Sequence, residues 1–178
     1  MHHTLPFYGR FRHKFLKLYI FSAKLTLIPL LGRLVRWVAN SYGRNRHGGY
    51  FITLGEAERM IDVSNSVALG PCGCRQVFHN CDRPIMTEIV VGAGREIYSK
   101  MGKKGFRQVS KEEAKEVMRQ CHGSGMMHTV MQCQGLFYAL CSCCSCCCVP
   151  TRLKKNYGVE YAITKRKNIV ADFEKQCW

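Results

Sequence analysis

The sequence Cys141-Ser-Cys-Cys-Ser-Cys-Cys-Cys148 places six thiols within eight positions. A single cysteine is readily explained as a small apolar core residue, but six nearly consecutive ones cannot all point to one face of a helix or strand. Disulfides within the run would be strained, because neighbouring cysteines rarely reach the required Cα separation and torsion. A tight, irregular loop whose thiolates bind a soft metal explains the stretch better, and we expect the chain to be organised around it.

The composition favours metal binding over a disulfide framework. The chain has 178 residues and 12 cysteines, which is long enough for one domain with a buried core and no covalent staples. The first residues, Met-His-His-Thr-Leu-Pro-Phe, lack the apolar stretch and cleavage site of a secretory signal, so we expect a cytoplasmic protein. Clustered cysteines in a reducing compartment are typical of metal sites.

The net charge of +15 at pH 7 indicates an acidic partner. Nucleic acid, an anionic membrane surface and an acidic protein all satisfy that condition. Two four-iron clusters, each carrying about −2 with its thiolates, would leave the protein basic.

Residues 1–45 form a basic amphipathic segment that we expect to be helical up to Pro29 and again beyond it. Its basic residues share one side at 100° per residue; they are Arg10, His13, Lys14, Lys17 and Lys24. Arg12 falls on the apolar side. The longest uncharged stretch, residues 25–32, is far shorter than the roughly 20 apolar residues that cross a bilayer.

Two interpretations of this segment stay open. An in-plane helix would lie on the inner face of a membrane, and its contact residues would be Phe15, Leu18, Tyr19 and Trp37. Alternatively, the helix packs on the protein's own core. Nucleic acid is the less favoured partner, because large apolar residues are abundant in the same stretch.

Residues 46–178 predict an α+β fold with a small, mostly antiparallel sheet, two or three capped helices and irregular cysteine-rich loops that meet at one end. Capping boxes at Thr53-Leu-Gly-Glu56 and Ser110-Lys-Glu-Glu113 begin two of the helices. The predicted strands cover residues 85–91, 128–133, 136–140, 161–164 and 168–173, with a hairpin turn at Gln134-Gly135. A short basic helix is expected over residues 152–158, ending at a glycine.

A second group of thiols precedes the first in the chain. Glycines and a proline keep the backbone irregular around Cys72 and Cys74, and Cys81 follows in the same loop. We expect these three to lie beside the 141–148 run. The predicted metal ligands are Cys72, Cys74, Cys81, Cys141, Cys143, Cys144, Cys146, Cys147 and Cys148. Additional candidate ligands or proton donors are Cys121, His122, His128 and Cys133.

Together these pieces resemble the cysteine-rich domain that lies upstream of the ferredoxin module in certain 4Fe-4S binding proteins of anaerobic prokaryotes. The matching pieces are residues 70–75, 81–84, 110–114, His128 and 141–148, within a likeness that covers roughly residues 53–177. The resemblance implies iron–sulfur binding and an anaerobic context. The relatives continue into ferredoxin repeats where this chain stops at Cys177-Trp178, so we expect Cys177 not to be a ligand.

The leading hypothesis is an iron–sulfur protein with one or two 4Fe-4S clusters that transfers electrons or serves as a redox subunit. Its partner would be an acidic ferredoxin or a reductase subunit that docks on Lys165, Arg166 and Lys167. One alternative is a zinc-binding basic module that contacts nucleic acid. Another is a redox enzyme with an open cluster iron, in which His122 or His128 exchanges protons.

Overall fold

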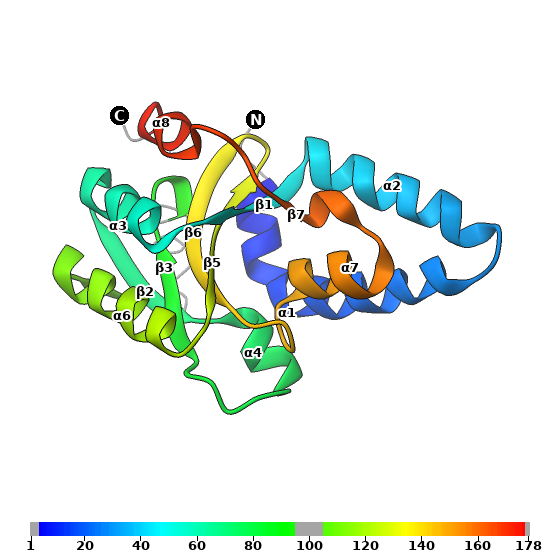
Figure 1. Ribbon diagram of the computed structural model, residues 1–178, viewed down its shortest axis with the longest axis horizontal. Coiled ribbons are helices and arrows are strands. Elements are labelled where there is room, and N and C mark those ends of the chain that lie inside the picture. Colours follow the sequence, from blue (N-terminus) through cyan, green and yellow to red (C-terminus); the bar gives the residue numbers. More distant parts are fainter. Residues whose placement is uncertain (1–3, 95–104, 177–178) are drawn as a thin grey trace.

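A computed structural model describes residues 4–94 and 105–176 of the chain (Figure 1). Cys177 lies outside these residues. In chain order the elements are α1 (Thr4–Ala23), η1 (Lys24–Leu27), α2 (Leu31–Asn45), β1 (His47–Ile52), α3 (Leu54–Val63), β2 (Val67–Pro71), α4 (Gly73–Phe78), β3 (Met86–Val90), β4 (Arg107–Val109), α6 (Lys111–Gly123), β5 (Met127–Cys133), β6 (Leu136–Cys143), α7 (Val149–Tyr157), η2 (Glu160–Ala162), β7 (Ile163–Thr164) and α8 (Ile169–Glu174).

The strands form one sheet in the order β4-β2-β3-β6-β5-β1-β7. Neighbouring strands run antiparallel except β1 and β7, which are parallel. The predicted α+β class is confirmed. The sheet is larger than expected, with seven strands among the described residues, and β7 makes it mixed.

One face of the sheet carries the main apolar core. Helices α3, α6 and α8 pack there through residues such as Met60, Met118 and Phe173, which meet Ile89 and Leu140 of the central strands. This arrangement follows from strand periodicity, since alternate residues of a strand point to opposite faces. In Figure 1 these three helices lie on the left and top of the sheet.

The other face is covered by α1. Its buried residues Tyr8, Leu16 and Ile20 lie in apolar clusters that include cysteines of the sheet and of its loops. Arg12, the residue that interrupts the apolar side of this helix, forms an ion pair with Glu88 of β3. The cysteine-rich loops therefore lie beneath the N-terminal helix.

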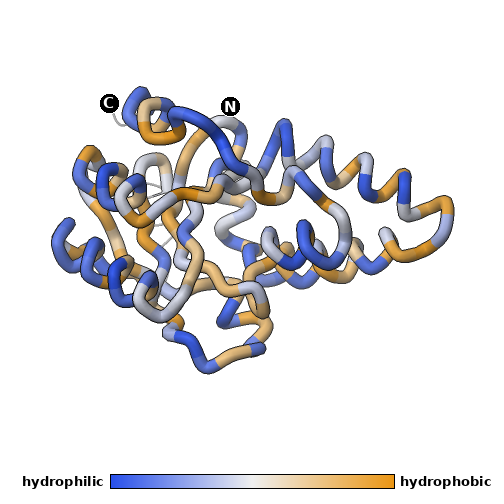
Figure 2. The backbone as a smooth tube through the Cα atoms, in the orientation of Figure 1, coloured by the Kyte–Doolittle hydropathy of each residue, from blue (hydrophilic) through white to orange (hydrophobic). Residues whose placement is uncertain are grey.

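Helices α1 and α2 form a hairpin that projects from the sheet, with η1 at its tip (Figure 1). Gly32 lets the two arms approach closely, because a Cβ there would lie 2.1 Å from the carbonyl oxygen of Thr26. Arg36 donates a hydrogen bond of 2.6 Å to that same oxygen. Figure 2 shows the tip as hydrophobic. Among the helices of residues 4–94 and 105–176, none combines the length and the apolarity needed to cross a bilayer.

Local signals in the sequence account for several boundaries. Thr53 and Glu56 form the reciprocal capping box at the start of α3, whereas at α6 only Ser110 caps, because the Glu113 carboxylate pairs with Arg107. The hairpin between β5 and β6 is present. The prediction of a strand over residues 168–173 is wrong: residues 169–174 form α8.

Candidate metal centre

Strand periodicity divides the cysteine run. Cys141 and Cys143 lie in β6 on the face covered by α1, whereas Ser142 between them points to the opposite face. The next residues leave the strand in a turn, and Cys148 occupies the position just before the first turn of α7. The run is thus half strand and half loop, and its thiols separate into two groups.

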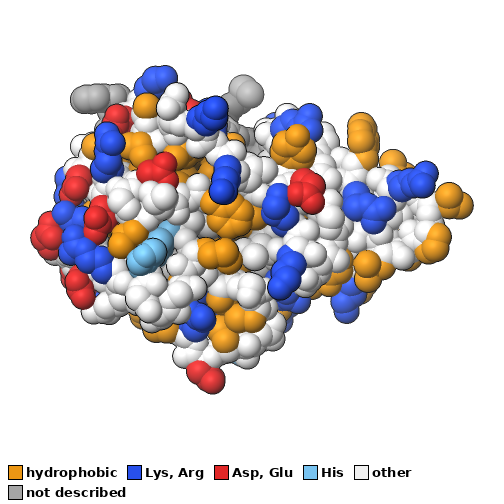
Figure 3. Space-filling model, in the orientation of Figure 1, with side chains coloured by type: hydrophobic (Ala, Val, Ile, Leu, Met, Phe, Trp, Pro, Cys, Tyr) orange, Lys and Arg blue, Asp and Glu red, His pale blue; other side chains and the backbone are white. Residues whose placement is uncertain are grey.

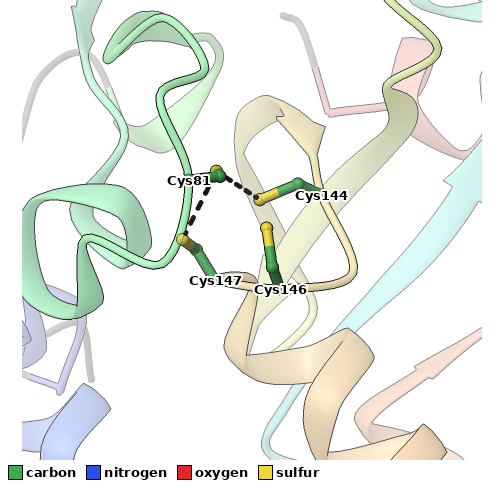
Figure 4. A group of neighbouring side chains, drawn as sticks. All are labelled: Cys81, Cys144, Cys146 and Cys147. Carbon is green, nitrogen blue, oxygen red and sulfur yellow. Dashed lines mark hydrogen bonds between the residues drawn. The ribbon is translucent and has the colours of Figure 1, made fainter.

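Four thiols converge at the bottom of the molecule. Cys81 comes from the loop after α4, and Cys144, Cys146 and Cys147 come from the connection between β6 and α7 (Figure 4). The Sγ atoms of these four all lie within 4.8 Å of one another. Cys81 Sγ is 3.8 Å from Cys144 Sγ and 3.7 Å from Cys147 Sγ. We refer to them as the four-cysteine site.

Hydrogen bonds from Asn80 hold the two loops of this site together. The Asn80 amide N–H donates to Cys147 Sγ at 3.3 Å, and the Asn80 side chain donates to the Cys146 carbonyl at 2.9 Å. Within the second loop, the Cys148 amide donates to the Cys144 carbonyl at 3.2 Å. The loops are therefore held in register by protein contacts as well as by the thiols.

The thiols of this site differ in acidity. Burial raises the pKa of Cys144, but hydrogen bonds from the Cys147 amide, Cys146, Arg75 and Cys81 outweigh it and bring the pKa down to about 6. Burial raises the pKa of Cys147 to about 12. Hydrogen bonds and a positive charge favour the thiolate, whereas burial disfavours it. Cys144 consequently loses its proton at a lower pH than Cys147 and is a thiolate at neutral pH.

The spacing of the sulfurs matches a single tetrahedral metal ion. Four thiolates bonded to one ion at about 2.3 Å lie about 3.8 Å apart, close to the two distances that Cys81 makes. A cubane spaces its terminal sulfurs roughly 6 Å apart, because each thiolate binds a different iron. The residues present therefore fit one tetrahedrally bound ion, and four close cysteines provide a possible metal site.

A second group of thiols, the inner thiols, is Cys72, Cys74, Cys143 and Cys148. Hydrogen bonds link them in the order Cys72, Cys74, Cys148, Cys143, and all four are buried. The hydrogen bond with Cys148, and then burial, raise the pKa of Cys74 to about 12, although the contact with Cys72 lowers it. The inner thiols are therefore neutral in the metal-free protein near pH 7. Cys141 lies in the same apolar cluster as Cys143 and Cys148.

The remaining predicted ligands lie elsewhere. His128 pairs with Ser142 across β5 and β6, with its Nδ1 at 3.3 Å from the Ser142 hydroxyl, and His122 stacks on it. Cys121 also contacts Ser142. These three therefore lie across the sheet from Cys141 and Cys143. Cys133 pairs with Leu136 beside the hairpin turn, several residues along β6 from the thiols. The structure does not bring these residues into the four-cysteine site.

The residues predicted to contact a membrane or a partner protein differ in their exposure to solvent. Leu18 and Trp37 are exposed, whereas Phe15 and Tyr19 are half-buried against the sheet side of α1. Lys165, Arg166 and Lys167 are exposed in the connection from β7 to α8, and Arg166 pairs with Asp172. Figure 1 places this connection far from α4 and the four-cysteine site.

Two buried arginines were not expected. Arg75 donates to the Ser142 carbonyl at 3.0 Å and to Thr87, and its Nη1 lies 4.0 Å from Cys144 Sγ. In the sequence, Arg12 is a charged residue on the apolar side of a helix. Such a position indicates a buried charge, which needs a partner of opposite charge. Arg75, which follows Cys74 in the chain, carried no comparable signal.

Comparison of this chain with family models, with curated proteins and with solved structures finds no match. Its function is therefore inferred from its own residues.

Proposed function

We propose that this protein binds one metal ion through Cys81, Cys144, Cys146 and Cys147. The observation that carries the proposal is the pair of sulfur–sulfur distances from Cys81, 3.8 Å and 3.7 Å, which fit a tetrahedral ion. The ion would join the loop after α4 to the connection between β6 and α7. Residues more than sixty positions apart in sequence would thereby be fixed at one point.

Zinc is the ion that this donor set fits best. Four thiolates in a tetrahedron are typical of structural zinc, whereas a catalytic zinc keeps one position open for water. Here all four positions are cysteines. Four thiolates around a divalent ion leave a charge of about −2, and the guanidinium of Arg75 beside Cys144 offsets part of it. The proposed role of the ion is to stabilise the fold at this end of the sheet.

The experiment is metal analysis of protein purified under anaerobic, reducing conditions. We expect a colourless protein with one zinc per chain, and cobalt in its place should give the blue-green absorption of a tetrahedral thiolate site. Cys81→Ser should lose the metal, whereas Cys133→Ser, a matched change at a buried cysteine beside the hairpin turn, should keep it. A wild-type protein without bound metal would refute the proposal.

An iron–sulfur cluster is the second candidate, and the inner thiols favour it. Cys72, Cys74, Cys143 and Cys148 all border one cavity, which provides space for a cluster that the four-cysteine site lacks. A brown protein that bleaches with dithionite would support this candidate. Cys72→Ser and Cys148→Ser should then lose colour, whereas Cys81→Ser should keep it.

If such a cluster is present, the basic segment before α8 is the proposed docking site for an acidic ferredoxin. Lys165 and Lys167 are exposed, and opposite charges accelerate encounter. Reversing both charges should slow reduction at low ionic strength and leave iron content unchanged. Equal rates for the variant and the parent protein would exclude this docking site.

A further inference from the structure

A cavity of about 570 Å³ lies between the α1–α2 hairpin, α7 and the sheet. Binding sites for small molecules typically occupy several hundred cubic ångströms and are mostly apolar. The wall of this cavity is aromatic and aliphatic on the helical side, and sulfur forms part of it on the sheet side. Thiols behave as small apolar groups, so the cavity is suited to an apolar occupant.

Charged and hydroxyl groups of this wall are already engaged by the protein, and Arg75 donates to the Ser142 carbonyl and to Thr87. Arg12 pairs with Glu88, the Tyr19 hydroxyl lies 3.0 Å from that of Tyr42, and the Tyr138 hydroxyl lies 3.2 Å from Nε2 of His47. A charged ligand would have to displace these contacts to be neutralised. The wall therefore selects a neutral molecule.

His47 and Arg75, two residues of the wall, each have a polar atom that remains unused. Among the described residues, His47 Nδ1 and Arg75 Nε are buried without a hydrogen-bond partner, and both residues line the cavity. Buried polar atoms are nearly always paired in folded proteins, so each unpaired one needs an explanation. A carbonyl or hydroxyl group on a ligand would pair with either of them.

The mouth of the cavity opens among exposed apolar residues. Leu18, Leu34 and Val38 line the cavity and are also exposed to solvent, each by more than half. The apolar surface includes Trp37 of α2, which is 69% exposed, and reaches the tip of the hairpin, where Leu30 is 85% exposed. Figure 3 shows hydrophobic side chains gathered at this end of the molecule with Lys and Arg among them.

This surface has the chemistry of a bilayer contact. Exposed apolar patches mark interaction sites, and apolar residues interleaved with basic ones are typical of helices that lie on anionic membranes. Lys17, Lys24 and Arg33 are exposed on the same hairpin. A molecule dissolved in the bilayer would thus reach the mouth of the cavity without crossing water.

We infer that the cavity binds a neutral, lipid-soluble molecule with a carbonyl or hydroxyl group, taken from a membrane on which the α1–α2 hairpin lies. The inference does not depend on the ion in the four-cysteine site, whereas a cluster on the inner thiols would occupy the same cavity and exclude the ligand. Metal content is measured on the same samples, so that loss of the ligand site and loss of the metal site are distinguished.

The probe is prodan, a neutral naphthalene ketone whose emission shifts to the blue in apolar surroundings. Titrated into the full chain, it should bind saturably at one site. Val35→Trp fills the cavity and should weaken binding by at least about ten-fold. Val63→Trp makes the same change at an exposed position outside the cavity, at the end of α3, and should bind like the parent protein. Equal affinity in Val35→Trp and the parent would overturn the inference.

His47→Phe keeps the apolar wall and removes the unpaired nitrogen, so it tests the polar contact without filling the cavity. This variant should weaken prodan binding. The emission of the prodan that does bind should stay further to the blue than with Val35→Trp. Unchanged affinity would exclude His47 as the group that recognises the carbonyl.

The membrane route is tested by flotation with vesicles made of equal parts phosphatidylcholine and phosphatidylglycerol. The parent protein should float with them, whereas the double variant Leu30→Ser/Trp37→Ser should not. Both changes are at exposed positions, so the double variant should still bind prodan in solution. A parent protein that bound prodan but stayed off the vesicles would overturn the membrane route.

Discussion

Arg12 of α1 and Glu88 of β3 form a buried, bidentate ion pair. The two terminal nitrogens of Arg12 donate to the two carboxylate oxygens of Glu88, each at 2.7 Å. Arg12 is 7% exposed and Glu88 is 1% exposed. Taking two such charges out of water is costly, and their attraction repays the cost only while both are present. This pair joins the N-terminal helix to the middle of the sheet.

The ion pair predicts a pattern of stabilities. Arg12→Met and Glu88→Met should each lower the free energy of unfolding by about 3 to 5 kcal/mol, because each leaves one buried charge unpaired. The double variant Arg12→Met/Glu88→Met should lose less than either single variant. Urea denaturation of the metal-loaded protein under reducing conditions measures all three. Additive losses in the double variant would show that the two side chains do not act as a pair.

Removal of the metal should loosen one end of the sheet. A ligand that binds only the folded state at a thousandfold over its dissociation constant stabilises that state by about 4 kcal/mol. A strong chelator should therefore lower the unfolding midpoint and speed amide hydrogen exchange at Asn80 and Cys148, whose N–H groups bond within the loops. The capped helix α3, far from the site, serves as the internal control. Equal changes in α3 would point to global destabilisation instead.

Metal affinity should rise with pH. Cys144, with a pKa of about 6, is a thiolate at neutral pH, whereas Cys147, with a pKa of about 12, must lose its proton when metal binds. The apparent association constant should increase about tenfold per pH unit for each proton released. The dependence should steepen below pH 6, where Cys144 also binds a proton. Competition with a chelator of known affinity between pH 5 and 9 measures the slope; a flat profile would contradict the proposed ligands.

His128 should make the fold sensitive to acid. Burial, and then the neighbouring His122, lower its pKa from 6.5 to about 4. Between these values the unfolded chain binds a proton that the folded protein does not, so stability falls as pH drops from about 6.5 to 4. The shift corresponds to about 3 kcal/mol. His47, with its pKa also lowered to about 4 by burial and then by Arg12, adds to the same loss.

Denaturation at a series of pH values tests this dependence. His128→Gln should flatten the loss between pH 6.5 and 4, and His47→Gln should flatten the remainder. The parent protein, measured at the same pH values, is the control. A profile that is the same in His128→Gln and the parent would show that His128 titrates normally.

Local signals in the sequence were sufficient for much of the fold. The capping residues Thr53 and Ser110 mark the starts of α3 and α6, and Gly158, with a φ of 68°, ends α7. The strand prediction for residues 168–173 was wrong because it relied on their β-branched side chains. In the structure Ile169, Val170 and Phe173 lie on one buried helix side, and their spacing fits a helix equally well.

The sequence predicted which cysteines belong to the candidate site, but it did not predict which of them lie together. The thiol-rich run and the loop around Cys81 were evident from spacing, yet the sequence could not separate Cys144 from Cys143. That separation depends on where β6 ends: Cys143 is the last residue of the strand and Cys144 lies in the turn. The distance between His128 and the thiols depends on strand register, which local sequence does not specify.

The contact of α1 with the sheet sets an order of events during synthesis. Arg12 and its partner Glu88 are 76 residues apart, and several of the thiols that α1 also covers follow later still, in β6 and in the connection from β6 to α7. Contacts between such distant residues form late and slow folding. The apolar hairpin therefore leaves the ribosome long before the strands that it will cover exist. Until those strands are made, the apolar side of the hairpin has no partner within this chain, and the cysteines can assemble beneath α1 only once β6 and the connection to α7 have followed.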